Sequence, residues 1–145
     1  MAALTADTEL FKGDQYTEQS DSVSGVIGLY GLYDFTKHLV NEKEDSYIPL
    51  MLQLFLSNMD EETLSLASPV NYADRNRIPF LLLHGTGDRQ VPYQQSILFH
   101  DRLLQYHNDV HLYLLEGADH ADGNFSQPEV QDIIMNFLQN SHPEA

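Results

Sequence analysis

Three short apolar runs, each followed by a segment with a helical pattern, constrain the fold of this chain more than any other feature. The runs are Val23–Tyr30, Ile78–His84 and Val110–Leu115, and all three suit β-strands. Strands that alternate with helices pair in parallel, because the crossover connections are right-handed and lay the helices on the faces of the sheet. We therefore predict the α/β class, with a parallel sheet of about three strands and flanking helices.

Two segments carry the clearest helical pattern. Val91–Tyr106 has Pro92 near its start and three aromatic or leucine side chains on one side. The last helix opens at Ser126–Glu129, and shorter helices are expected at Met1–Leu10 and at Asp60–Ala67, where Ser68-Pro69 ends the second one. The apolar stripe of the last helix consists of Val130, Ile133, Ile134, Phe137 and Leu138.

The segment from Thr36 to Met59 is also helical in pattern, and it contains the dense apolar block Tyr47–Leu56. A helix that is apolar on nearly every face packs in a core, covers a substrate pocket or meets another subunit, and all three readings stay open. We predict one α/β domain over residues 1–145, with residues 36–67 as a helical insertion that resembles a cap.

Charge and composition exclude several classes of function. The net charge of −15 at pH 7 repels nucleic-acid phosphates and anionic lipid surfaces, so neither is an expected partner. The chain has no cysteine, hence no thiolate metal site and no cysteine nucleophile. No run approaches the roughly 20 apolar residues of a membrane helix. We expect a soluble protein, with the cytoplasm as the favoured compartment.

Two polar side chains follow consecutive predicted strands. Asp88 comes just after Ile78–His84 in a Gly-Thr-Gly-Asp loop, and His120 comes just after Val110–Leu115. Ligands of parallel sheets gather at the carboxyl ends of the strands, where neighbouring loops meet. A carboxylate bonded to one imidazole nitrogen leaves the other nitrogen free to take a proton from a serine hydroxyl. The alternative is that both residues only form turns, for which this loop composition is also suited.

Other polar residues have weaker claims to a site. His84 ends a strand and is interpreted as a structural histidine rather than a catalytic one, while Asp34 and Asp119 are expected to brace loops at the same edge. The aromatic side chains Tyr30, Tyr33 and Phe35 either line a substrate pocket or pack in the core. We predict no metal site at His107 and His111, which straddle a helix-to-strand junction. His38 and His100 are expected on helix surfaces, and His142 in a terminal tail.

Several segments resemble the C-terminal part of α/β-hydrolase esterases, of the carboxylesterase and feruloyl-esterase-like kind, and of their prolyl-oligopeptidase relatives. The resemblance covers about Val23 to Leu138 and is carried by Pro79–Asp88, Val91–Ser96 and Glu116–Phe125, together with Ser68-Pro69 and Asn71-Tyr72. It implies that Asp88 is the acid and His120 the general base of a catalytic triad. The order acid, then histidine, also matches that fold.

The same resemblance implies that the nucleophile lies outside this chain. In these esterases a Gly-x-Ser-x-Gly turn is followed by a helix whose opening resembles Met1–Ala6, so the serine is expected just upstream of residue 1. None of the ten serines has the flanking glycines of that turn. The resemblance therefore implies a serine hydrolase for small-molecule carboxylic esters that needs no metal or organic cofactor. The chain alone is expected to be inactive.

Two alternatives remain open at this stage. One is peptide cleavage of the prolyl-oligopeptidase type, and the other is a non-catalytic truncated fragment or a flavodoxin-like binding module. A half-hydrolase would also expose a sheet edge along Val23–Tyr30, and unpaired edges invite self-association.

Overall fold

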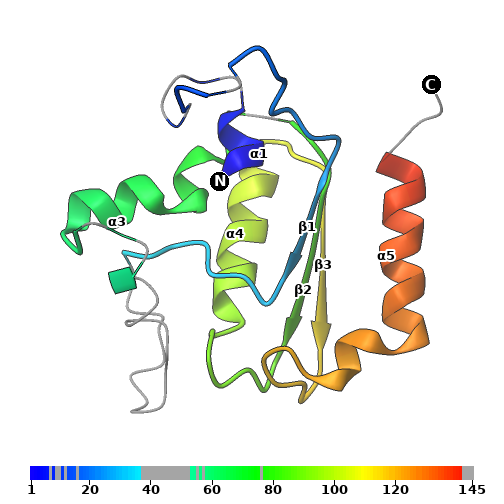
Figure 1. Ribbon diagram of the computed structural model, residues 1–145. Helices are drawn as coiled ribbons and strands as arrows, with labels where there is room; N and C mark the ends of the chain where they lie inside the picture. The colour runs from blue at the N-terminus through cyan, green and yellow to red at the C-terminus, as the bar shows by residue number, and fades with distance from the viewer. Residues whose placement is uncertain are drawn as a thin grey trace.

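The computed structural model describes residues 1–6, 8, 11, 13–15, 17–36, 53–54, 56, 58–75 and 77–141. Three strands form one sheet: β1 (Val26–Leu29), β2 (Phe80–Gly85) and β3 (Val110–Leu115). They lie in the order β1-β2-β3, and both pairs are parallel, so all three carboxyl ends lie at one edge (Figure 1). The predicted α/β class, with a parallel three-stranded sheet, is confirmed.

The strand boundaries differ slightly from the predicted runs. β3 has the predicted bounds, whereas β1 is shorter than Val23–Tyr30 and only half-buried, because it is an outer strand of the described sheet. Tyr30 leaves the strand with a φ of 43°, a conformation that side chains other than glycine rarely adopt. β2 begins one residue after Pro79, which has no N–H for the ladder, and every one of its residues is buried.

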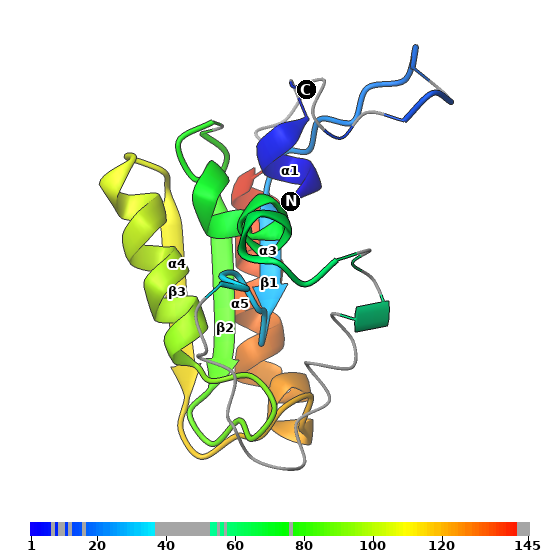
Figure 2. The ribbon, with the colours of Figure 1, turned by 90° about the vertical axis from the view of Figure 1, so that its left-hand side faces the viewer.

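Helices cover the two faces of the sheet. α4 (Gln94–Gln105) packs on one face and α5 (Pro128–Ser141) on the other, as two views at right angles show (Figures 1 and 2). Side chains of β2 alternate between two cores, as expected of a strand that is buried on both faces. On the α4 side Phe80 and Leu82 pack with Phe99 and Leu103, and on the α5 side Leu81 and Leu83 pack near Val130 and Phe137.

The two long helices match the predicted segments with shifted ends. α4 starts later than Val91, because Val91 to Tyr93 form the loop and turn that lead into it. A 3₁₀ turn, η3 (Gly123–Ser126), precedes α5, whose predicted stripe faces the sheet only in part. Val130 is buried, whereas Leu138 at the far end is 40% exposed.

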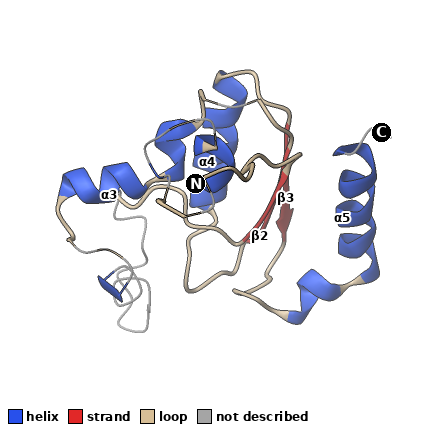
Figure 3. Ribbon diagram, turned by 45° about the horizontal axis from the view of Figure 1, so that its top comes forward, coloured by secondary structure: helices blue, strands red, loops and turns tan. Residues whose placement is uncertain are grey.

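Two short helices lie on the α4 side of the sheet. α3 (Glu61–Ala67) confirms the helix predicted at Asp60–Ala67, and the Asp60 side chain caps it by accepting from the Thr63 N–H at 2.8 Å. Figure 3 shows α3 on the side of α4 that faces away from α5. The other short helix, α1 (Ala2–Thr5), is shorter than the predicted Met1–Leu10, and the 3₁₀ turn η2 (Pro69–Tyr72) follows α3.

The proposed insertion at residues 36–67 lies for the most part outside the described residues, as do its apolar block Tyr47–Leu56, His38 and the tail residue His142. Among the helices that the structure describes, none combines the length and the apolar composition needed to span a membrane.

Candidate active site

Asp88 and His120 meet at the carboxyl edge of the sheet. β2 ends three residues before Asp88 and β3 ends five residues before His120, so two neighbouring parallel strands deliver both side chains to one place. The Asp88 Oδ2 atom lies 2.8 Å from the His120 Nδ1 atom. The predicted contact between this carboxylate and this imidazole is confirmed.

The Asp88 carboxylate is surrounded by hydrogen-bond donors. Its Oδ1 atom accepts from the backbone N–H groups of Gln90 and Val91, each at 2.8 Å. Its Oδ2 atom contacts His120 Nδ1 and also His84 Nε2, the latter at 3.1 Å. The Asp88 side chain has no exposed surface, so these contacts replace the water that a carboxylate would otherwise bind.

These contacts define the proton position on His120. A carboxylate only accepts, so Nδ1 of His120 carries the proton that it donates to Asp88. In the neutral ring, Nε2 is then the acceptor, with a lone pair available as a general base. The His120 side chain is 30% exposed, so this nitrogen can be reached from outside.

The loops that carry the pair are tied to each other by backbone contacts. The N–H of Gly87 donates to the Ala118 carbonyl at 3.0 Å, and the N–H of Gly117 donates to the Thr86 hydroxyl at 2.8 Å. A Cβ atom on Gly85 would overlap the carbonyl of Ala118, so only glycine allows this approach. The distance between Asp88 and His120 therefore depends on loop packing as well as on the strands.

An ion pair reinforces the same junction from the solvent side. The Asp119 carboxylate accepts from the backbone N–H of Arg89 at 3.0 Å, and it also binds the Arg89 guanidinium and the N–H of His120. The backbone and side-chain donors of Arg89 lower the pKa of Asp119 to about 2. The expectation that Asp119 braces the loop is confirmed.

His84 is fully buried at the end of β2. Its Nδ1 atom lies 2.7 Å from the Ser96 hydroxyl, and its Nε2 atom lies 3.0 Å from the Val91 carbonyl as well as near Asp88. Burial lowers the pKa of His84, outweighing the opposing effects of Val91 and Asp88, so the neutral form is favoured. His84 therefore has the structural role predicted for it. Its contact with Asp88 was not predicted from the sequence.

Tyr30 is a neighbour of His120 that the sequence could not identify. Its ring centroid lies 4.6 Å from that of His120 and 5.0 Å from that of Phe125. The position of Tyr30 directly after β1 indicates that it lies at the carboxyl edge of the sheet. Its contact with a ring 90 residues away depends on how the loops pack, which the sequence does not show. Ala121, next to His120, also has a positive φ of 54°, and such backbone strain is common at functional sites.

The other residues considered for the site from the sequence have different surroundings. Asp34 binds the Thr36 hydroxyl at 2.6 Å and exchanges backbone hydrogen bonds with the Gln95 side chain, so it braces a loop as expected. Tyr33 stacks on Phe99 at 4.4 Å inside the core, and burial raises its pKa to about 12. No cluster of three or more His, Asp or Glu side chains suited to a metal ion occurs within the described ranges.

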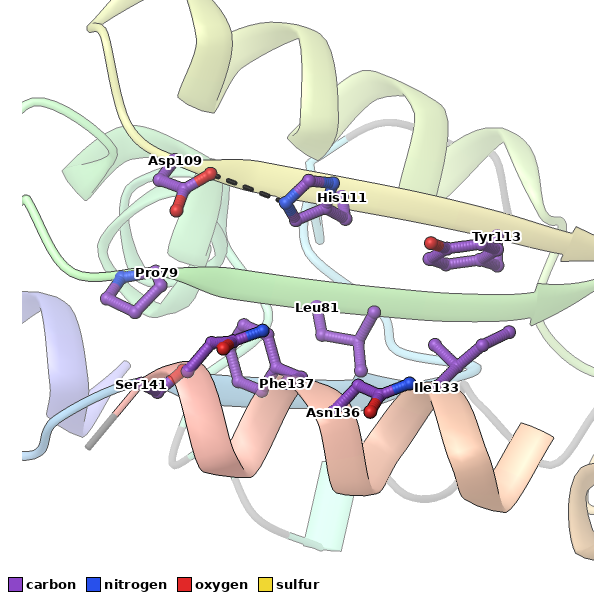
Figure 4. Close-up of a pocket in the computed structure, with 10 residues that line it drawn as sticks. Pro79, Leu81, Asp109, His111, Tyr113, Ile133, Asn136, Phe137 and Ser141 are labelled. Carbon is purple, nitrogen blue, oxygen red and sulfur yellow. Dashed lines mark ion pairs between the residues drawn. The ribbon is translucent and has the colours of Figure 1, made fainter. Parts of the chain in front are cut away.

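A hollow of about 320 Å³ lies between α5 and the sheet, and its lining runs from the amino ends of β2 and β3 along the strands as far as Tyr113 (Figure 4). Pro79 and Asp109, which directly precede β2 and β3, line it together with Phe137 of α5. Neither Asp88 nor His120 is among the residues that line it.

Comparisons with known proteins agree with this arrangement. The model of the BD-FAE family matches residues 1–103. Esterase LipC of Mycobacterium tuberculosis is 30% identical over 149 aligned residues, which are 98% of this chain and 37% of LipC. The probable carboxylic ester hydrolase LipM of the same organism is 32% identical over 112 residues, 72% of this chain and 25% of LipM. This chain thus spans about a third or less of the length of these relatives.

A solved structure shows the same fold. The truncated form of a carbohydrate esterase from gut microbiota matches with a TM-score of 0.77 at 20% identity, over 97% of this chain and 54% of that one. Because the family model matches most of its residues and the parallel sheet matches this esterase, the chain belongs to the BD-FAE family of the α/β-hydrolase superfamily.

Proposed function

We propose that this chain is the part of a serine hydrolase that supplies the triad acid Asp88 and the triad base His120, and that the complete enzyme hydrolyses carboxylic esters. The observation that carries the proposal is the 2.8 Å contact between Asp88 Oδ2 and His120 Nδ1, at the carboxyl edge of a parallel sheet. The ester specificity is supported by the names of the two sequence relatives, an esterase and a probable carboxylic ester hydrolase.

The geometry suggests a role for each group in the reaction. His120 Nε2 takes the proton of a serine hydroxyl as the serine oxygen attacks the ester carbonyl. Asp88 holds the ring by its Nδ1–H and stabilises the imidazolium that forms. The imidazolium then protonates the departing alcohol, which leaves an acyl-enzyme. Water attacks this ester in the second half of the cycle, with His120 again as base, and releases the carboxylic acid and the free serine.

The proposal assigns the nucleophile to residues outside 1–145. Ser24 is followed by Gly25 but has Ser22 two residues before it, so it lacks the glycine pattern of a nucleophile turn. The buried hydroxyls of Ser68 and Ser96 are engaged by Phe35 and His84, respectively. Among the described residues, no serine hydroxyl bonds the His120 imidazole.

Two preparations test the proposal with p-nitrophenyl butyrate as substrate. The first is the 145-residue chain alone, and the second is this chain expressed in continuity with the reading frame upstream of Met1. We expect no His120-dependent turnover from the first. We expect ester hydrolysis from the second, together with labelling of an upstream serine by a fluorophosphonate.

The variant His120→Ala is the control in both preparations. If the chain alone hydrolyses the ester and His120→Ala abolishes this activity, the proposal that the nucleophile lies outside residues 1–145 is refuted. Turnover by the extended protein that it leaves unchanged would refute the role of His120. An acyl-peptide substrate tested in parallel covers the peptidase alternative, since preference for the peptide over the ester would overturn the ester assignment.

A further inference from the structure

The buried histidine at the end of β2 has no role in the mechanism above, yet it touches the catalytic carboxylate. His84 lies four residues before Asp88, and neither side chain has any exposed surface. Its Nε2 atom shares the Oδ2 atom of Asp88 with His120 Nδ1, at 3.1 Å and 2.8 Å respectively. The same carboxylate oxygen therefore contacts two imidazole groups, one from β2 and one from the loop after β3.

The contacts of His84 fix its tautomer. Nε2 faces two acceptors, the Asp88 carboxylate and the Val91 carbonyl, so it must carry a proton. Nδ1 faces the Ser96 hydroxyl at 2.7 Å, which can donate to its lone pair. Every polar atom of the ring is thus satisfied in one neutral state, with the Nε2–H shared between the Val91 carbonyl at 3.0 Å and Asp88 Oδ2 at 3.1 Å.

We propose, on the basis of the function above, that His84 is a positioning residue, whose Nε2–H holds Asp88 Oδ2 in the orientation that receives the His120 imidazole. The backbone N–H groups of Gln90 and Val91 hold the Oδ1 atom of Asp88, and neither contacts Oδ2. Besides His120 itself, His84 is the side chain that contacts the other oxygen among the described residues. It approaches from β2, whereas His120 comes from the loop after β3.

The neutral state of His84 matters for this role. Burial lowers its pKa, so it adds a donor next to Asp88 without adding a second positive charge. The charged or titratable groups that act on it are Asp88 and His120. A protonated His84 would oppose the imidazolium that forms on His120, so a neutral donor is the form that supports the reaction.

Four variants of the 145-residue chain separate positioning from simple packing. His84→Met fills a similar volume but has no donor. His84→Gln keeps an amide N–H that can reach the position of Nε2. Ser96→Ala disturbs the opposite side of the ring and leaves the Nε2–H in place, so it is the matched structural control. His100→Met controls for the loss of a histidine, because His100 bonds only its neighbour Asp101 among the contacts described.

The readout is the hydrogen bond between His120 and Asp88, measured from the solvent exchange of the His120 Nδ1 proton in ¹⁵N-histidine NMR spectra. Backbone amide spectra verify that each variant is folded. We expect His84→Met to accelerate this exchange by about 10-fold, the equivalent of one hydrogen bond. We expect His84→Gln, Ser96→Ala and His100→Met to stay close to the parent chain.

A folded His84→Met chain with unchanged exchange at His120 would overturn the proposal, and so would equal acceleration in Ser96→Ala. If His84→Met does not fold, the test rests on His84→Gln and Ser96→Ala. A positioning role requires both variants to keep the hydrogen bond between His120 and Asp88. In the extended protein, His84→Met should lower kcat for the ester by about 10²-fold at unchanged KM. The NMR result holds even if no esterase activity is found, so failure of the proposed function is distinguishable from failure of this inference.

Discussion

At the scale of single residues, the site is organised around the two oxygens of Asp88. Oδ1 is held by the backbone of its own loop, through Gln90 and Val91, and Oδ2 faces the two imidazoles. One oxygen thus anchors the side chain, and the other is available to orient His120. A buried carboxylate with four donors would be costly to replace by any group that itself donates.

Replacing Asp88 by asparagine tests whether Oδ1 and Oδ2 have these separate roles. The amide oxygen should stay with the N–H groups of Gln90 and Val91, which places the amide NH₂ opposite the N–H groups of His84 and His120. Donors then face donors, so His120 must change tautomer or turn away. In the extended protein we expect ester turnover to fall by about 10⁴-fold, measured with p-nitrophenyl butyrate. A loss smaller than tenfold would contradict the role of Asp88 as the triad acid.

The sequence allowed Asp88 and His120 to be chosen, because both follow apolar strand runs and glycine-containing loops that resemble an esterase pattern. It could not reveal that His84 and Tyr30 touch the same pair. Their contacts depend on side-chain directions at the ends of β2 and β1, and a linear pattern does not carry that information. The sequence around His84 in particular would look the same whether its side chain faced a loop carbonyl or a catalytic carboxylate.

At the scale of elements, the important feature is how closely the loop after β2 approaches the loop after β3. Gly85 lies against the carbonyl of Ala118, and Gly87 bonds to it. This approach brings Asp88 to His120. The junction tolerates no side chain at Gly85, whereas Gly123 in η3 has open space where a Cβ would lie.

We therefore expect Gly85→Ala and Gly123→Ala to differ sharply, although the chemical change is the same. Gly85→Ala should destabilise the fold by about 1–3 kcal/mol, because the backbone must move to remove the overlap. Gly123→Ala should remain within about 0.5 kcal/mol of the parent. Urea unfolding of the two variants provides the comparison, and equal midpoints would show that the loops are not packed as described.

The ion pair between Arg89 and Asp119 makes the same junction sensitive to acid. The folded-state pKa of Asp119 is depressed from 3.8 to about 2, chiefly by hydrogen bonds from Arg89. The contribution of this carboxylate to stability is therefore complete above pH 3.8 and is lost as the pH falls through about 2. The Arg89 amide and Nε–H resonances should follow this transition in the parent chain. In Asp119→Asn the transition should be absent, and its persistence there would assign it to another group.

The elements themselves were largely predictable. The three strands, α3, α4 and α5 fall where the apolar periodicity placed them, since burial of one face or of both faces imposes that periodicity. The first and last residues of these strands and helices were less predictable. β1 stops at Leu29 because Tyr30 takes a positive φ, and the 3₁₀ turn before α5 depends on the capping contact of Asp122 with the Asn124 N–H.

At the scale of the whole molecule, β1 is an outer strand of the described sheet, and its residues Val26–Leu29 include no charge. Natural edge strands usually carry charges or proline that prevent pairing with another chain. Opposing this tendency is the net charge of −15, which makes copies of the chain repel each other at pH 7.

We accordingly propose that the isolated chain self-associates through the edge of β1, and that association strengthens with salt as the repulsion is screened. Sedimentation velocity over a range of protein and salt concentrations measures this. The expected result is a rise in the weight-average mass with both variables. A folded monomer at every concentration and salt level would exclude the β1 edge as an interaction surface.

The most direct test of the account is the rate at which the extended protein, carrying the upstream reading frame, hydrolyses p-nitrophenyl butyrate with and without the imidazole at position 120. If His120 is the general base that Asp88 orients, His120→Ala should reduce kcat by about 10⁴-fold or more, while the fold is retained. If the folded variant hydrolyses the ester as fast as its parent, the contact between these two side chains is structural and the hydrolase assignment of this site is wrong.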